Sequence, residues 1–181
     1  MRIISGTYKG KRLTAPKKLP VRPTTDMAKE ALFNILNNRV HFSGLKVLDL
    51  FSGTGNISYE FASRGSGPII SVDGHIECIK FIKKTSEELE MDILPIKSDV
   101  FKYLEKAGTK ADIVFADPPY DFTEDQFKKI AELVFDHEVL NEDGMLIIEH
   151  SKHTDLSSGR NFNEARRYGN SVFSFFLPIL K

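Results

Sequence analysis

The fold is indicated first by the stretch LKVLDLFSGTG, residues 45–55, in which an apolar run leads into a glycine-containing loop. The run 45–51 is typical of a buried parallel strand, and residues 57–63 are typical of a short helix after the loop. Glycines in such a loop let the backbone approach a ligand and let the helix begin without a Cβ clash. Ser58 stands where a dinucleotide fingerprint has its third glycine, so a pyrophosphate ligand is disfavoured. Asp49 at the strand end instead favours a ligand with a cation or hydroxyls.

Further strand-like runs alternate with helical patterns along the chain. Strands are expected at 68–73, 92–97, 111–116 and 144–149, and Pro95 places the second of these at a sheet edge. Helices are expected at 76–89 and 124–136, and at about 26–36 after a Thr24-Thr25-Asp26 cap. The runs 163–168 and 171–177 are expected to be antiparallel strands. This alternation predicts a doubly wound α/β sheet whose ligands bind at the carboxyl ends of the strands.

Two more acids follow the second and third expected strands. Asp73 ends the run 68–73, and Asp99 comes shortly after the run 92–97. At such strand ends, Asp73 is a candidate to hold ribose hydroxyls, and Asp99 an adenine amino group with apolar cover from Val100 and Phe101. Either acid is equally suited to cap the following helix, so the residues alone leave both interpretations open.

The run 111–116 leads directly into Asp117-Pro118-Pro119-Tyr120. Neither proline donates a backbone hydrogen bond, and the residue before each is kept out of the α region. We therefore expect a rigid, extended elbow that presents free carbonyl groups, one carboxylate and one ring. Such an elbow is suited to hold an amino group on a flat heterocycle. The alternative is a plain strand end, with Tyr120 packed elsewhere.

Length and composition favour one globular domain and exclude several classes of protein. The 181 residues are 41% hydrophobic and 28% charged, which is ordinary for a globular enzyme. The single cysteine, Cys78, excludes an internal disulfide and suits a reducing cytoplasm. We expect no secretory signal and no membrane span, because the chain has no suitable apolar run. His150 and His153 have no partners at metal-ligand spacing.

The charge distribution is uneven although the net charge is zero. The first 25 residues contain seven Lys or Arg residues and no acid, so the remaining residues carry a net charge of −7. Residues 2–7 and 10–14 are expected to pair as a hairpin. A basic arm on an acidic body is typical of a protein that contacts polyanions, but a solvated terminus without a ligand has the same composition.

Together these features resemble the class I S-adenosylmethionine-dependent methyltransferases that modify exocyclic amino groups. The chain is similar over nearly its whole length to the RsmD-type methylases, which methylate the 2-amino group of guanine 966 in bacterial 16S ribosomal RNA. The similarity lies in MRIISGxxKGKRL at 1–13, RPTTDxxKEALFNIL at 22–36, VLDLFSGTG at 47–55, LxxxGMLIIEH at 140–150 and RRYGNS at 166–171.

The resemblance implies a Rossmann-like, mostly parallel seven-stranded sheet with an antiparallel last strand, preceded by a β-hairpin and a helix. It implies a basic arm at 1–22 and a methyltransferase domain at 23–181. The cofactor would be S-adenosylmethionine, without a metal. The partner would be 16S ribosomal RNA, the small ribosomal subunit or an assembly intermediate, and the protein would be a cytoplasmic monomer.

The resemblance also assigns roles to individual residues. The cofactor would be bound by Thr25, Asp49, Phe51, Ser52, Gly53, Gly55, Asp73, Gly74, Asp99 and Val100. The catalytic residues would be Asp117, Pro118, Pro119 and Tyr120, and RNA would be bound by Arg2, Lys9, Lys11, Arg12, Arg22 and Thr24. The Asp117 carboxylate and the Pro118 carbonyl would hold the two amino hydrogens while Tyr120 stacks on the base.

Other functions stay open at the level of the sequence. A methylase of DNA adenine or cytosine uses a similar elbow but usually carries a separate target-recognition region, and another RNA guanine is an equally good target. A glutamine methylase of release factors normally has Asn at position 117. An NAD-dependent oxidoreductase is disfavoured by the missing third glycine. A non-catalytic RNA-binding module would require a cofactor pocket that no longer functions.

Overall fold

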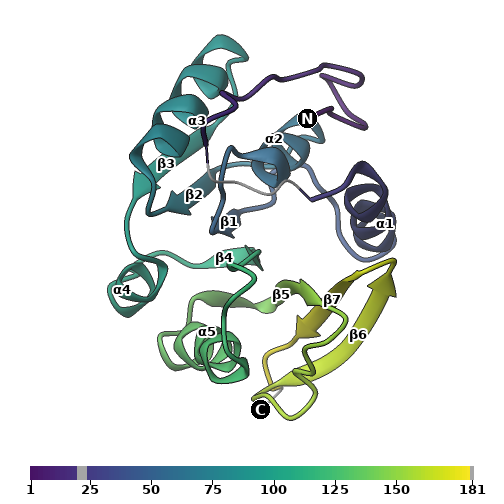
Figure 1. Cartoon of the computed structure of the whole chain (residues 1–181), viewed down its shortest axis with the longest axis vertical. Coiled ribbons are helices and arrows are strands. Elements are labelled where there is room, and N and C mark those ends of the chain that lie inside the picture. Colours follow the sequence, from purple (N-terminus) through teal and green to yellow (C-terminus); the bar gives the residue numbers. More distant parts are fainter. Residues whose placement is uncertain (20–23, 180–181) are drawn as a thin grey trace.

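The computed structural model describes residues 1–19 and 24–179, which form a seven-stranded sheet with helices on both faces. The strand order is β3-β2-β1-β4-β5-β7-β6 (Figure 1). Strands β1 to β5 run parallel, whereas β7 runs antiparallel to both β5 and β6. The strands are β1 Val47–Leu50, β2 Ile69–Asp73, β3 Ile93–Lys97, β4 Ala111–Ala116, β5 Leu140–Ser151, β6 Phe162–Tyr168 and β7 Ser171–Phe176.

Five helices of the described residues cover the two faces of this sheet. Helices α1, α2 and α3 lie on one face, and α4 and α5 lie on the other (Figure 1). This is the arrangement of a doubly wound α/β fold. The helices are α1 Asp26–Asn37, α2 Asn56–Ser63, α3 Ile76–Glu88, α4 Val100–Glu105 and α5 Glu124–Asp136.

Successive residues of the central strands enter two separate apolar cores. In β4, Ile113 and Phe115 pack in the core under α1, α2 and α3, whereas Val114 and Ala116 pack in the core under α4 and α5. All four residues are fully buried. A strand that is covered on both faces needs an apolar residue at every position. The continuous apolar runs of the sequence therefore reflect a sheet with helices on both sides.

The predicted fold class is confirmed, including the antiparallel last strand and the edge position of β3. Thr25 caps α1 as expected, since its hydroxyl accepts a hydrogen bond from Ala28 N at 3.2 Å. The largest differences from the prediction are at two elements, and other elements differ by one or two residues at their ends. Strand β5 begins at Leu140 rather than at residue 144. Helix α4 was not predicted as an element, because six residues are too few to show a helical apolar period.

The N-terminal arm makes a hairpin turn, but it does not form the ladder predicted for 2–7 against 10–14. Arg2 and Arg12 make a single antiparallel bridge. Ile3 N donates to Lys11 O at 2.9 Å, and Gly10 N donates to Ile3 O at 2.8 Å. The predicted extent of pairing is therefore wrong, because the backbone beyond Ile3 bonds to helix α2 instead.

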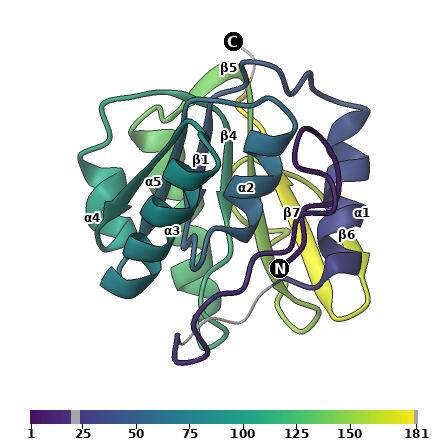
Figure 2. The ribbon, with the colours of Figure 1, turned by 90° about the horizontal axis from the view of Figure 1, so that it is seen from above.

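The arm is docked along α2, and the two lie side by side in Figure 2. Ile4 N donates to Glu60 Oε1 at 2.8 Å near the middle of the helix, and Thr7 N donates to Ser63 O at 2.7 Å at its end. Gly6 has a φ of +90°, and a Cβ there would lie 1.9 Å from Ser63 O. Only glycine allows the arm to approach the helix this closely.

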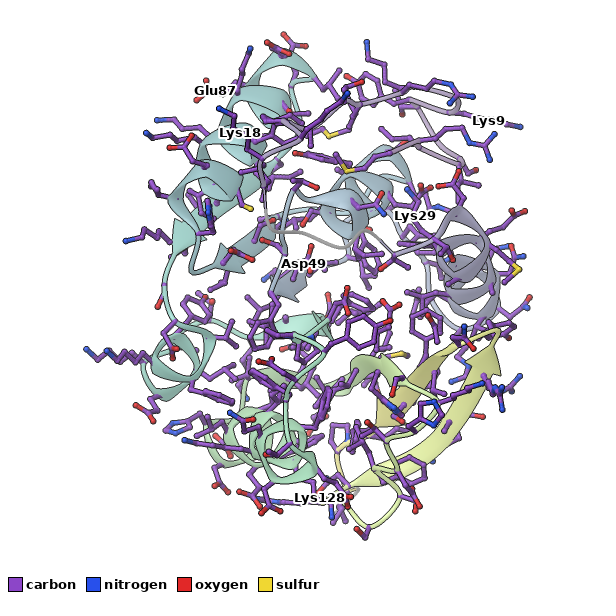
Figure 3. The ribbon with its side chains drawn as sticks, viewed as in Figure 1. Lys9, Lys18, Lys29, Asp49, Glu87 and Lys128 are labelled. Carbon is purple, nitrogen blue, oxygen red and sulfur yellow. The ribbon has the colours of Figure 1, made fainter. Side chains whose placement is uncertain are left out.

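A buried ion pair joins α1, α2 and the arm. Lys29 Nζ lies 3.2 Å from Glu60 Oε1, and both side chains are completely buried. The same nitrogen donates to Arg2 O at 2.7 Å and to Asn56 Oδ1 at 2.8 Å, and Figure 3 labels Lys29 between the two helices. Burial lowers the pKa of Lys29, and the Glu60 carboxylate opposes that shift. Three oxygen acceptors therefore hold this ammonium group in the interior.

The helices of residues 1–19 and 24–179 are short. The longest, α3 and α5, have 13 residues each. A membrane-spanning helix needs about 20 apolar residues, and none of the described helices meets that requirement. The same part of the chain contains no group of three or more His, Cys, Asp or Glu side chains placed to hold a metal ion.

Candidate active site

A cavity of about 630 Å³ opens where β1, β2, β4 and β5 end, and the β3–α4 and β6–β7 turns also line it. A volume in this range suits a ligand of nucleotide size. The Asp-Pro-Pro-Tyr elbow after β4 divides its lining into two parts. The β1–β3 side contains Asp49, Phe51, Ser52, Gly53, Asp73, Gly74, Asp99 and Val100, and the β5–β7 side contains Glu149, His150, Ser151, Thr154, Asn170 and Ser171.

Asp49 is a buried acid in β1, with 1% of its surface exposed (Figure 3). Ser58 Oγ donates to Asp49 Oδ2 at 2.6 Å and also lies 2.6 Å from Ser71 Oγ. Burial raises the pKa of Asp49 to about 7; the Ser58 hydrogen bond opposes the shift, and the charge of Asp73 adds to it. A cation bound nearby would favour the ionised form of this carboxyl group.

The loop after β1 has a sharply bent backbone. Phe51, Gly53 and Gly55 all have positive φ angles, of 56°, 54° and 92°. At Gly55 a Cβ would lie 2.7 Å from Tyr59 Cζ, so the start of α2 has no space for a side chain. Phe51, Ser52 and Gly53 line the cavity, whereas Gly55 does not. The structure thus places Gly55 at the N-cap of α2, beside the predicted cofactor site.

Asp73 connects two of the loops that line the cavity. Its Oδ2 accepts a hydrogen bond from Gly53 N at 2.9 Å, and its Oδ1 accepts one from His75 N at 2.8 Å. The N-cap of α3 is His75, so Asp73 is not the helix cap that the sequence left open as an alternative. A carboxylate has about four acceptor positions, so ribose hydroxyls and these two amides can be served together.

Asp99 combines both of the roles that the sequence left open. It is the N-cap of α4, where its Oδ1 accepts a hydrogen bond from Lys102 N at 3.0 Å, and it also lines the cavity. Val100 follows it, is buried, and lines the cavity as well. The three acids of the β1–β3 side therefore share one cavity, although they are 24 or more residues apart in sequence.

All four residues of the elbow line the cavity between its two sides. Asp117 is half-buried and Pro118 is buried, whereas Pro119 and Tyr120 are exposed. Tyr120 exposes 63% of its surface, which is a large fraction for an aromatic residue beside a cavity. The expectation of free carbonyl groups is wrong at Pro119, whose oxygen accepts a hydrogen bond from Phe122 N at 3.1 Å.

An aromatic cluster that the sequence did not predict supports the elbow. The ring of Phe122 lies 5.4 Å from that of Phe51, 6.0 Å from that of Phe101 and 5.8 Å from that of Phe127, measured between centroids. Tilted and stacked arrangements at these distances are favourable. The cluster joins the ends of β1 and β4 to α4 and α5, so it stabilises the position of the elbow.

The β5–β7 side of the cavity was missed in the sequence. Glu149 and His150 follow the apolar positions of β5, and both are buried, with 6% and 7% of their surface exposed. The strand-end rule that identified Asp73 could also have identified Glu149. Thr24, predicted to bind RNA, lines the cavity and donates from Oγ1 to Glu149 Oε2 at 2.9 Å.

His150 is held in one orientation by its two ring nitrogens. Nδ1 lies 2.9 Å from Ser151 O, and Nε2 lies 2.7 Å from Ser174 Oγ. A carbonyl can only accept, so Nδ1 carries the proton of a neutral ring and Nε2 accepts from the serine hydroxyl. Burial lowers the pKa of His150, which favours this neutral form. His150 therefore forms an uncharged part of the cavity wall.

Four other residues predicted to bind RNA lie outside the cavity. Arg2, Lys9, Lys11 and Arg12 are exposed on the arm, and none of them lines the cavity. Figure 3 shows Lys9 on the periphery of the molecule. Arg22 falls outside the described residues. Thr25, predicted to bind the cofactor, uses its hydroxyl as the N-cap of α1 and does not line the cavity.

The chain has clear relatives in sequence. Residues 1–177 match the family described as conserved hypothetical protein 95. YlbH of Bacillus subtilis, named as a candidate rRNA methyltransferase, is 34% identical over 86% of this chain and 85% of its own length. The ribosomal RNA small subunit methyltransferase D of Buchnera aphidicola subsp. Baizongia pistaciae is 30% identical over 82% of this chain and 75% of its own length.

Solved structures share the fold. The Escherichia coli protein yhhF, described as a candidate methyltransferase, has a TM-score of 0.83 at 22% identity and covers 97% of this chain and 96% of its own. The Thermus thermophilus 16S rRNA N2 G1207 methyltransferase RsmC, solved with AdoMet and guanosine, has a TM-score of 0.71 at 18% identity and covers 88% of this chain and 45% of its own. These values show a common class I methyltransferase architecture.

Proposed function

The chain belongs to the conserved hypothetical protein 95 family, and from that premise we propose that it methylates a guanine of 16S ribosomal RNA at the 2-amino group. S-adenosylmethionine would be the methyl donor, and guanine 966 would be the target. One sequence relative and one solved structure support this proposal. The ribosomal RNA small subunit methyltransferase D of Buchnera carries the reaction class in its name, and RsmC binds AdoMet and guanosine within a similar fold.

The observation that carries the proposal is the composition of the cavity. Three acids on its β1–β3 side face a ligand region that leads to the Asp-Pro-Pro-Tyr elbow. The cavity volume of about 630 Å³ accommodates a nucleoside with an amino-acid chain. Asp73 suits the ribose hydroxyls, Asp99 suits the adenine amino group, and Asp49 lies where an ammonium or sulfonium charge would be stabilised. These three acids therefore fit the parts of S-adenosylmethionine.

When bound, S-adenosylmethionine supplies a methyl group attached to a sulfonium. The neutral thioether that remains after transfer is a good leaving group. The residues of this chain would orient the nucleophile. The Asp117 carboxylate and the Pro118 carbonyl accept the two hydrogens of the guanine amino group, and this leaves the nitrogen lone pair directed toward the methyl donor. Tyr120, exposed beside the cavity, would stack on a base that has been flipped out of the RNA.

The exchange of Asp117 for alanine tests this function. We expect Asp117→Ala to lower methyl transfer to 16S ribosomal RNA by about 100-fold or more, because the amino group loses its orientation. Binding of S-adenosylmethionine, measured by calorimetry, should stay within about twofold of the wild-type value. Asp121→Ala is the matched control, since Asp121 is exposed directly after the elbow. Full activity of Asp117→Ala would contradict the proposed mechanism.

Mass mapping of ribosomal RNA identifies the target. RNA from a strain without this gene should lack one methyl group on a guanine, and purified protein should restore it. Naked RNA, assembly intermediates and finished subunits should be compared as substrates in the same assay. A methyl group that appears on DNA or on a glutamine side chain, and not on the RNA, would replace the proposed function with one of the alternatives.

A further inference from the structure

Glu149 occupies the carboxyl end of β5, next to the elbow that ends β4. Ala116 pairs with Ile148 in the parallel register of these two strands, so Asp117 and Glu149 are the next residues on neighbouring strands. Both residues line the same cavity. The cavity thus contains an acid next to Asp117 on its β5–β7 side, across the elbow from Asp49, Asp73 and Asp99.

The surrounding residues hold Glu149 in position. Its surface is 6% exposed, and Oε2 accepts a hydrogen bond from Thr24 Oγ1 at 2.9 Å. Thr24 O in turn accepts from Asn56 Nδ2 at 3.4 Å. Asn56 Oδ1 accepts from the fully buried Lys29 Nζ at 2.8 Å. A chain of contacts therefore runs from the buried ion pair of α1 and α2 to the carboxyl group of Glu149.

Two acids side by side match the edge of guanine. Guanine presents the N1–H and the 2-amino group as adjacent donors on its Watson–Crick edge. Adenine and cytosine carry an unprotonated ring nitrogen beside their amino group, and an acceptor facing that nitrogen is repelled. Proteins read unstacked bases by hydrogen bonds to this edge. A carboxylate accepts about four hydrogen bonds, so Glu149 can serve both Thr24 and a base N–H.

Building on the proposed function, we propose that Glu149 accepts the N1–H of the target guanine while Asp117 holds its 2-amino group. Asp117 then orients the reacting nitrogen, and Glu149 selects guanine over bases without a hydrogen at N1. Thr24 is a positioning residue, because its hydroxyl orients the Glu149 carboxylate. A base that lacks N1–H would leave the buried carboxylate facing a ring lone pair, which is costly.

The test compares guanosine with 2-aminopurine riboside at the target position of one RNA fragment. 2-Aminopurine keeps the 2-amino group but has no hydrogen at N1. We expect wild-type protein to methylate the guanine at least about 100-fold faster, as sites built to hydrogen-bond a substrate group reject analogues without it. In Glu149→Gln this ratio should fall to about tenfold or less, because an amide can donate to the unprotonated N1.

Comparing this ratio between proteins cancels the difference in intrinsic reactivity between the two amino groups, which is the same for every variant. Glu142→Gln is the matched control, because Glu142 is an exposed residue at the other end of β5. This control should keep the wild-type ratio. Thr24→Val should give an intermediate ratio, since the carboxylate of Glu149 stays but loses its orienting hydroxyl.

The outcomes separate this inference from the proposed function. If wild-type protein methylates neither RNA, the proposed function is wrong. If it methylates guanine and the ratio in Glu149→Gln equals the wild-type ratio, Glu149 does not select the base. If Glu149→Gln does not fold, as judged by its melting transition and by S-adenosylmethionine binding, the ratio of Thr24→Val decides, and an unchanged ratio overturns the inference.

Discussion

Asp49 illustrates how single residues of the cavity depend on burial. The acid is 1% exposed and is bonded to Ser58, which also contacts Ser71. An acid that loses its hydration prefers the protonated form, and this preference exceeds the opposing effect of the serine hydroxyl. The same residue in an exposed loop would be ionised at neutral pH. The charge of the cavity lining therefore depends on pH near neutrality.

We expect Asp49→Asn to change how stability depends on pH. The folded-state pKa of Asp49 is raised from 3.8 to about 7. Between these values the unfolded chain has released a proton that the folded chain keeps. The contribution of Asp49 to the free energy of unfolding is thus greatest below about pH 4, falls as the pH rises to about 7, and is constant above that. The full change is of the order of 4 kcal/mol.

Urea unfolding from pH 4.5 to pH 8 measures this effect as the difference between wild-type protein and Asp49→Asn. That difference should vary with pH. Asp121→Asn is the matched control for the removal of an acid, because Asp121 is exposed. Parallel stability curves for wild-type protein and Asp49→Asn would show that Asp49 titrates normally.

At the scale of elements, α1, α2 and the arm are held together by one buried cation. Lys29 Nζ in α1 contacts Glu60 and Asn56 of α2 and Arg2 O of the arm, so it joins three separate segments. Glu60 also accepts from Ile4 N and from Arg64 Nε at 2.9 Å. Such a cluster adds less to stability than its contacts suggest, because both charges are desolvated, but removing one partner leaves the other uncompensated.

Lys29→Met should lower the free energy of unfolding by about 3 kcal/mol, the lower end of the range for a broken buried ion pair, because the buried Glu60 then keeps only Arg64 as its cation. The arm should also loosen, so the amide hydrogens of Ile4 and Ser5, which donate to Glu60, should exchange faster. Lys80→Met is the control, since Lys80 pairs with Glu77 on the exposed face of α3. It should change stability by no more than about 1 kcal/mol. Equal effects of the two variants would contradict a special role for Lys29.

The elements also show which structural features the sequence patterns predict and which they do not. The run 111–116 and the helix 124–136 were predicted to the residue, because β4 is covered on both faces and α5 has an amphipathic period with a Thr123 capping box. Helix α4 was missed, since a six-residue helix shows no period. The number of paired residues in the hairpin was overestimated, because a local pairing pattern contains no information about a competing partner such as Glu60.

At the scale of the whole molecule, the basic arm lies along α2, and the other charges are distributed over the α/β body. Met1 accepts a hydrogen bond at its sulfur from Thr54 Oγ1, close to the cavity, whereas Thr7 bonds to Ser63 at the far end of α2. The turn of the arm therefore points away from the cavity. In the proposed function, its cations would contact RNA that extends beyond the target nucleotide.

Neutralising Lys9, Lys11 and Arg12 together should weaken RNA binding more at low salt than at high salt. Each lost phosphate contact removes about one unit from the slope of log K against log salt, so the slope should become shallower by about 2 to 3. The control exchanges Lys46, Lys106 and Lys110, three exposed lysines that precede β1 and β4 in sequence. An unchanged slope in the arm variant, together with a lower melting temperature, would show that the arm stabilises the fold and does not bind RNA.

The sequence by itself determined the alternation of strands and helices, the acids at three strand ends and the elbow at residues 117–120. These features follow from local rules, since backbone preferences and apolar periods act over a few residues. Only the tertiary structure decided that Lys29 is buried, that Asp99 both caps a helix and lines the cavity, and that Thr24 meets Glu149. Those contacts join residues up to 125 positions apart, and they depend on strand register and helix packing, which no local pattern specifies.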